Sequence, residues 1–218
     1  MLSIDIGLKH LAHCLLRDKI ESWDVNNLAP SYTCCSKSTH HLGDLFLCKK
    51  CLATKELPQL ITLSNQHESP IGTKKEMIAS LKRKWVSNEP DMVEIGKRLI
   101  QVYDTFENVT TVLVENQIGP LASKMKGIQG MVVQYWLMRG ADVHCIAAVN
   151  KLKLFHTGPT TYSQRKKLGI QYAKKVLVDK GWDDTAFLKH KKKDDLADTL
   201  LQAIWFLETN KIFADYLK

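Results

Sequence analysis

The order of strand-like and helix-like segments constrains the fold of this chain more than any other feature. Three short strand-like segments come first, at residues 2–6, 10–16 and 19–25; the first is apolar, and the third places Ile20, Trp23 and Val25 among polar residues. Later segments alternate between helical spacing (residues 74–85, 91–106, 123–139, 161–180 and 194–207) and β-branched strand patterns (residues 109–115 and 142–149). This order predicts an α/β fold with a sheet flanked by helices.

Residues 29–85 interrupt that order. Residues 29–72 carry Pro30, Pro58 and Pro70, a cysteine cluster and weak periodicity, which predicts loops rather than a continuation of the sheet. A basic helix over residues 74–85 follows. We therefore predict a single domain over residues 1–218 with a Cys-rich insertion at residues 29–85.

Composition narrows the class of protein. The chain has 218 residues, 44% of them hydrophobic, with a mean hydropathy of −0.20, which excludes a disordered chain and a membrane protein. The strand-like run at residues 2–6 leaves no space for a targeting segment. Six cysteines are too few for a disulfide scaffold in a chain of this length. These features predict an intracellular, reducing location with no membrane partner.

Positive charge is concentrated in one part of the chain. The net charge is +8 and the pI is about 9.1, and residues 150–193 contain twelve basic and three acidic residues. A Lys-rich helix is often only a solvated surface, but this segment runs directly into acidic residues, an arrangement suited to holding phosphates beside a metal site. Charge alone does not separate a nucleic acid from an acidic membrane or an acidic protein partner. If the partner is DNA, the candidate DNA-binding residues are Lys151, Arg165, Lys166, Lys167, Lys191, Lys192 and Lys193.

Carboxylates occur at strand ends and on an apolar helix. Asp5 lies within Ser3-Ile4-Asp5-Ile6-Gly7 and Glu115 ends an apolar strand, while Asp194, Asp195 and Asp198 begin the last helix. Each alone has a structural explanation, such as a turn, a backbone hydrogen bond or the helix dipole. Together, in a fold that brings the first and fourth strands beside the last helix, they predict a site for a hard divalent cation.

The insertion contains four of the six cysteines. Cys34 and Cys35 precede Cys48-Lys49-Lys50-Cys51, and the second pair has the spacing of a zinc knuckle. The adjacent first pair is irregular. Two interpretations remain, a structural zinc ion held by these four cysteines or reduced thiols without a metal.

The segment at residues 123–139 has two apolar stripes. One stripe is expected to cover the sheet. The second requires another partner, either a second subunit or the insertion.

Three motifs together resemble the RuvC-type Holliday junction resolvases of the RNase H-like superfamily, and most closely the branch of poxviruses, other large DNA viruses and fungal mitochondria. The first motif, Ser3 to Gly7 followed by Leu11-Ala12, is similar to the family's first strand. Val114-Glu115-Asn116-Gln117 and Lys192-Lys193-Asp194-Asp195-Leu196-Ala197-Asp198 are similar to its fourth strand and last helix. The resemblance covers residues 2–28 and about 90–208.

The resemblance implies an RNase H-like mixed five-stranded sheet and a Mg²⁺-dependent endonuclease that resolves four-way DNA junctions by paired symmetric nicks. Two Mg²⁺ ions per active site, replaceable by Mn²⁺, would hydrolyse the phosphodiester. Two equivalent nicks imply a homodimer, with residues 123–139 as the candidate interface. The family branch also suggests a viral protein. The implied catalytic residues are Asp5, Glu115, Asp195, Asp198 and Lys153, with Asp194 as a reserve metal ligand and Lys151 as the alternative lysine.

Two other functions fit parts of the pattern. Another RNase H-like nuclease, acting on RNA–DNA hybrids or flaps, would use the same carboxylates. A non-catalytic, zinc-containing nucleic-acid-binding module would use the cysteines and leave the acidic residues incidental. An actin-like ATPase is disfavoured because the sequence lacks a second glycine-rich phosphate loop of the expected kind.

Overall fold

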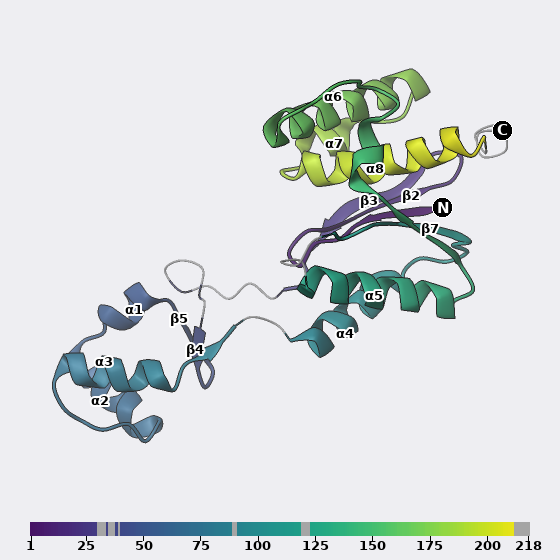
Figure 1. Cartoon of the computed structure of the whole chain (residues 1–218). Helices are drawn as coiled ribbons and strands as arrows, with labels where there is room; N and C mark the ends of the chain where they lie inside the picture. The colour runs from purple at the N-terminus through teal and green to yellow at the C-terminus, as the bar shows by residue number, and fades with distance from the viewer. Residues whose placement is uncertain (30–33, 35–37, 39, 89–90, 119–122, 212–218) are drawn as a thin grey trace. The chain divides into compact units, whose positions relative to one another are not determined.

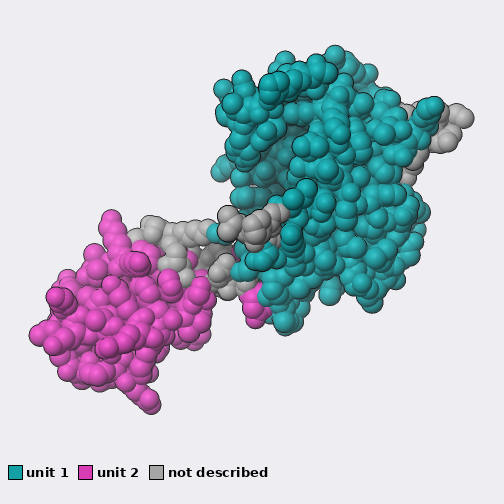
Figure 2. Space-filling model, viewed as in Figure 1, with its two compact units in different colours: residues 1–28, 92–218 teal, residues 29–91 magenta. Residues whose placement is uncertain are grey.

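The computed structural model describes residues 1–29, 34, 38, 40–88, 91–118 and 123–211. The chain forms two compact units, residues 1–28 with 92–218 (unit 1) and residues 29–91 (unit 2), which are distinguished by colour in Figure 2. The sequence led us to predict one domain with an insertion. In the structure the insertion forms the second unit, and each unit is described by itself below.

Unit 1 is built on a mixed five-stranded sheet. Its strand order is β3-β2-β1-β7-β8, in which β1 pairs antiparallel with β2 and β2 with β3, whereas β1 pairs parallel with β7 and β7 with β8. This order and these directions are those of the RNase H-like α/β class predicted from the sequence. The strands are β1 (Leu2–Asp5), β2 (Leu11–Leu16), β3 (Ile20–Asn26), β7 (Thr111–Glu115) and β8 (Asp142–Ile146).

Helices cover both faces of this sheet (Figure 1). One layer consists of α4 (Met92–Tyr103) and α5 (Ser123–Met138), which bury Leu99, Ile128 and Trp136 against the sheet. The other layer consists of α6 (Tyr162–Lys180), α7 (Thr185–Lys189) and α8 (Lys193–Thr209), with Leu200 and Phe187 in its core. Within the described residues, no helix is long and apolar enough to cross a membrane.

The strand predicted over residues 142–149 is too long. β8 ends at Ile146, and a 3-10 helix, η2 (Ala148–Leu152), follows at once. Its turns are closed by backbone hydrogen bonds from Asn150 N to Ala147 O (2.9 Å) and from Lys153 N to Asn150 O (3.1 Å). This change of geometry decides which lysine faces the site described below.

The two stripes of α5 contact the sheet and α4. Ile128, Val132 and Trp136 are buried in the core against the sheet. Met131, from the second stripe, lies over Gly96 of α4, where its sulfur would be 3.7 Å from a Cβ atom at that glycine. Part of the second stripe therefore packs against α4 within unit 1, rather than against a second subunit or the insertion. Leu137 and Met138 of α5 are exposed.

Unit 2 contains helices where the sequence led us to predict loops. Its core consists of Leu42, Leu47, Leu52, Leu60, Leu63, Met77 and Leu81. Thr73 caps α3 through a reciprocal capping box with Glu76. Pro58, which we took for a loop signal, lies in the first turn of α2, where proline is compatible with a helix. The elements are β4 (His40–Leu42), β5 (Leu45–Leu47), α1 (Lys49–Ala53), α2 (Leu57–Gln66), α3 (Lys74–Arg83) and β6 (Val86–Ser87).

Candidate active site

Asp5 and Glu115 lie side by side because of the sheet register. In the parallel pair β1–β7, Ile4 is the partner of Val114, so the next residue on each strand is one of the two carboxylates. Side chains alternate along a strand, and Ile4 and Val114 belong to the core beneath α4 and α5. Asp5 and Glu115 therefore point to the opposite face, toward α8, where both line the same cavity.

Asp198 reaches the same place from α8. Its helix packs on the sheet through an apolar face that includes Leu200 and Leu201. The neighbouring helix α6 approaches closely at Gly169, where a Cβ atom would lie 3.7 Å from Asp198 Oδ1. The helix therefore places a third carboxylate beside the two strand ends.

The ammonium group of Lys151 lies among these three carboxylates. Its Nζ is 2.9 Å from Asp198 Oδ2, 3.1 Å from Glu115 Oε2 and 3.9 Å from Asp5 Oδ1. Lys151 is only 5% exposed, which is unusual for a lysine unless its charge is paired. The candidate site is thus a buried cation surrounded by carboxylates.

Lys151, the alternative choice, occupies the position that we had assigned to Lys153. Lys153 is exposed and follows η2 as its C-terminal cap. Because a 3-10 helix has three residues per turn, a step of two residues turns the side chain away from the carboxylates. The structure therefore brings Lys151 to the cluster and leaves Lys153 outside it.

Burial and charge shift the pKa values of this cluster in different directions. Burial raises the pKa of Asp5 well above its usual range, although Lys151 opposes that shift. Burial alone would raise the pKa of Glu115, but hydrogen bonds with Asp5 and Lys151 and the lysine charge lower it. Burial raises the pKa of Asp198. Burial would lower the pKa of Lys151, but the three carboxylates raise it, so the lysine stays charged.

The two remaining aspartates of α8 have different environments. Asp195 lines the cavity described below, and its Oδ2 is buried and accepts no hydrogen bond from the described residues. The nearest cation is Lys192, whose Nζ lies 3.8 Å from that oxygen. Asp194 instead forms an ion pair with Lys166 of α6. Asp195 thus has an oxygen available to a cation, whereas Asp194 is already paired.

A cavity of about 320 Å³ opens over the carboxylates. One side of the cavity is acidic, and the other side is a basic and aromatic rim at the start of α6. Thr161 caps this helix, and Lys166 Nζ lies 5.1 Å from the centre of the Tyr162 ring. No spacing in the sequence marks Tyr162 as a residue of the site. The cavity is lined by Asp5, Glu115, Ala148, Lys151, Leu152, Tyr162, Arg165, Lys166, Asp195 and Asp198.

The predicted DNA-binding residues separate into three groups. Lys151 is buried among the three carboxylates, so it lies inside the acidic cluster, and its assignment to DNA binding stays a prediction. Arg165 and Lys166 line the cavity. The other residues lie outside the cavity lining: Lys167 and Lys191 are exposed, and Lys192 and Lys193 are partly exposed.

The donor set of this cavity fits a hard divalent cation. Carboxylate oxygens are the ligands that Mg²⁺ and Mn²⁺ prefer. Asp5, Glu115 and Asp198 already surround one positive group, and Asp195 Oδ2 is a buried oxygen without a hydrogen-bond partner in the described part of the chain. The residues predicted as metal ligands, Asp194 excepted, therefore line one cavity.

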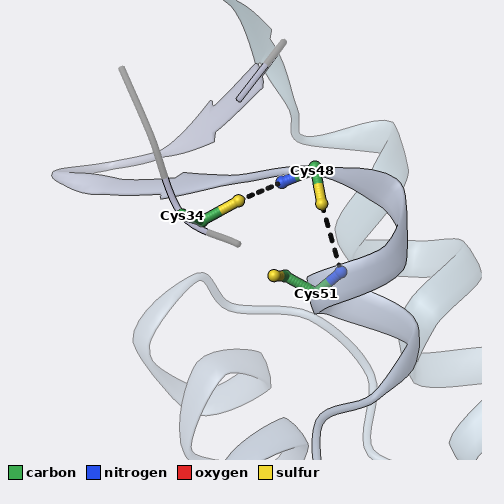
Figure 3. Close-up of side chains that lie close together, drawn as sticks. All are labelled: Cys34, Cys48 and Cys51. Carbon is green, nitrogen blue, oxygen red and sulfur yellow. Dashed lines mark hydrogen bonds between the residues drawn. The ribbon is translucent and has the colours of Figure 1, made fainter. Parts of the chain in front are cut away.

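A second group of metal-binding side chains lies in unit 2. The sulfur atoms of Cys34, Cys48 and Cys51 all lie within 4.8 Å of one another. Figure 3 shows these three side chains close together. Cys35, the fourth predicted zinc ligand, lies outside the described residues. The structure thus brings together three of the four cysteines.

Comparison with known sequences finds a viral relative, and no family model matches the chain. An uncharacterized protein of Acanthamoeba polyphaga mimivirus is 29% identical over 121 residues, which cover 46% of this chain and 29% of the viral protein. The match therefore spans less than a third of that relative.

The structure is similar to three solved structures of Holliday junction resolvases. The yeast mitochondrial resolvase has a TM-score of 0.48 and 15% identity, covering 99% of this chain and 82% of that chain. Thermus thermophilus RuvC has a TM-score of 0.47 and 14% identity, covering 96% and 97%. The same protein in complex with Holliday junction substrate has a TM-score of 0.46 and 14% identity, covering 96% of each chain. The assignment of the fold class rests on the strand order and directions given above.

Proposed function

We propose that this chain is a metal-dependent DNA endonuclease of the RuvC type that resolves four-way junctions. The observation that carries the proposal is the convergence of Asp5, Glu115 and Asp198 on Lys151 from two neighbouring strands and one helix. These are the residues that the family motifs select, apart from the choice of lysine. The resemblance of those motifs supports a nuclease rather than a purely structural acidic cluster.

Asp5, Glu115, Asp195 and Asp198 are the residues that would hold Mg²⁺ or Mn²⁺. Bound divalent ions would supply an activated water and stabilise the leaving oxygen of the phosphodiester. Lys151 keeps three carboxylates together in the absence of other cations and carries a positive charge that can stabilise developing negative charge on the phosphate.

The rim of the cavity supports DNA as the substrate. Arg165 and Lys166 lie at one edge of the cavity beside Tyr162, which is 67% exposed. Basic side chains position a nucleic-acid backbone, and an exposed aromatic ring can stack on an unpaired base. We infer that this rim holds the strand near the junction centre while the acidic part of the cavity acts on the phosphate.

Paired nicks require two active sites related by a two-fold axis, and the proposal therefore includes a homodimer. Apolar side chains on one layer of unit 1 remain exposed, among them Val93 and Ile100 of α4 and Leu137 and Met138 of α5. Sedimentation analysis of the full chain should give twice the mass of one chain. A monomer at the concentrations used for cleavage would contradict this part of the proposal.

The test of the function is cleavage of three labelled substrates by the same protein in Mg²⁺. We expect symmetric nicks in opposite strands of a synthetic four-way junction and much slower cleavage of a flap and of an RNA–DNA hybrid. Preferential cleavage of the hybrid or flap would favour the alternative nuclease. Binding without metal-dependent nicking of any substrate would favour a non-catalytic module.

A further inference from the structure

Three cysteine side chains of unit 2 meet at the start of α1, far along the chain from the acidic site. We propose that Cys34, Cys48 and Cys51 bind one zinc ion that stabilises the fold of unit 2. No disulfide joins any two of these three described cysteines, and their sulfurs lie within 4.8 Å of one another. A tetrahedral zinc with Zn–S bonds of about 2.3 Å needs sulfurs roughly 3.8 Å apart, so small side-chain rotations suffice.

Backbone amides already donate to two of the three sulfurs. Cys48 N donates to Cys34 Sγ at 3.2 Å, and Cys51 N donates to Cys48 Sγ at 3.4 Å (Figure 3). Such N–H donation favours the thiolate over the thiol, and contacts of this kind orient the ligands of protein metal sites. The backbone is therefore arranged for thiolate ligands before any metal binds.

The surroundings of the thiols match the charge of a zinc–thiolate site. Three thiolates and one Zn²⁺ carry a net charge of −1, and Lys55 lines a cavity of about 430 Å³ together with Cys34 and Cys51. Thr54 and Gln59 add polar groups to the wall of the same cavity, which also contains Leu45, Phe46 and Leu47. The fourth coordination position can be filled by water from this side.

The size of unit 2 explains what the metal would contribute. The unit spans residues 29–91, and its core contains seven buried hydrophobic residues. Domains of about 60 residues bury a smaller fraction of their surface on folding than larger domains do, and small folds commonly depend on a metal or disulfides. A zinc ion would join the segment before β4, through Cys34, to the start of α1, through Cys48 and Cys51. Its role is therefore structural.

The test measures zinc in the full-length protein purified under reducing conditions without added zinc. We expect one zinc per chain in wild type and near-complete loss in Cys34→Ser and Cys51→Ser. Replacement by Co²⁺ should give a thiolate-to-cobalt charge-transfer band and the intense visible absorption of a tetrahedral site. Cys145→Ser is the matched control, because this exposed thiol belongs to unit 1, and it should retain the zinc and the cobalt spectrum.

Three results would overturn the proposal. These are wild-type protein without stoichiometric zinc, cobalt binding without the thiolate band, and a Cys48–Cys51 disulfide that persists in protein purified under reducing conditions. If the serine variants fail to fold, the cobalt titration of wild type decides the question alone. Asp5→Asn should keep its zinc, since Asp5 belongs to unit 1 and is not one of the cysteine ligands. Zinc content is thus independent of nuclease activity, and either proposal can fail without the other.

Discussion

Lys151 Nζ donates a 2.9 Å hydrogen bond to Asp198 Oδ2, and the lysine side chain that makes this bond is buried. A buried ammonium of this kind is tolerated because its charge is compensated, and removing one partner of such a group is strongly destabilising. The lysine is therefore part of the architecture of the acidic site as well as of its proposed chemistry.

Substituting Lys151 tests both roles. Lys151→Met leaves three carboxylates close together without a cation, so we expect the free energy of unfolding in metal-free buffer to fall by about 3 kcal/mol. Mg²⁺ should recover part of this loss, and junction cleavage should fall about 100-fold. Urea unfolding with and without Mg²⁺, together with cleavage rates, provides the measurement.

Lys153→Met is the matched control, because Lys153 is exposed and two residues away. We expect it to change stability by less than about 0.5 kcal/mol and cleavage by only a few-fold. Equal effects of the two substitutions would show that Lys151 has no special role.

Asp194 and Asp195 should differ as metal ligands. Asp195 lines the cavity with a buried oxygen that lacks a hydrogen-bond partner in the described residues, whereas Asp194 is paired with Lys166. We expect Asp195→Asn to raise the Mg²⁺ concentration needed for half-maximal cleavage on the order of tenfold, and Asp194→Asn to raise it far less. Titration of Mg²⁺ against cleavage rate measures this, and the reverse ranking would reassign the ligand.

The buried side chain of His13 should make the folded protein less stable in acid. Burial lowers its pKa to about 4, and its ring accepts a 3.1 Å hydrogen bond from Asn26 at Nδ1 while Nε2 donates to Ser22 Oγ at 2.9 Å. The unfolded chain, with a histidine pKa of about 6.5, binds the proton more readily. This contribution is therefore fully present above about pH 6.5 and is lost as the pH falls toward 4, by up to about 3 kcal/mol.

Comparison with His13→Gln isolates that contribution from other titrating groups. Between pH 7 and pH 4, wild type should lose more free energy of unfolding than the variant, as measured by urea denaturation at each pH. Parallel pH profiles for the two proteins would rule out His13 as the source.

Gln202 links α8 to the strand that carries Asp5. Its Nε2 donates to Ser3 Oγ at 3.1 Å, and both side chains are buried. Gln202→Leu leaves the Ser3 hydroxyl without this partner and should cost about 2 kcal/mol. Adding Ser3→Ala should restore part of that stability, because both polar partners are then replaced. Thermal or urea unfolding of the double-mutant cycle measures the coupling, and strict additivity would mean that the two residues act independently.

The parts of the site that the sequence predicts well are those that depend on strand pattern. Asp5 and Glu115 each end an apolar strand, and the parallel register alone brings them together. The resemblance selected Asp195 and Asp198 over Asp194; the first two line the cavity and Asp194 does not, and their role as metal ligands stays a prediction.

The choice between Lys151 and Lys153 could not be made from the sequence because it depends on where β8 ends. Both lysines follow the strand predicted over residues 142–149, and an extended continuation of that strand would place them on one face, since side chains repeat every two residues. The 3-10 helix that replaces the end of the predicted strand separates them. Likewise, periodicity could not show that Met131 packs on Gly96 of α4, since a stripe does not identify its partner.

Substitution of the strand-end carboxylates tests the central claim most directly. Cleavage and binding of a four-way junction in Mg²⁺ should be measured for wild type, Asp5→Asn and Asp198→Asn. We expect both variants to bind the junction with affinity close to that of wild type while cleavage falls on the order of 1,000-fold. Cleavage at the wild-type rate by either variant would contradict the assignment of these residues as the catalytic site.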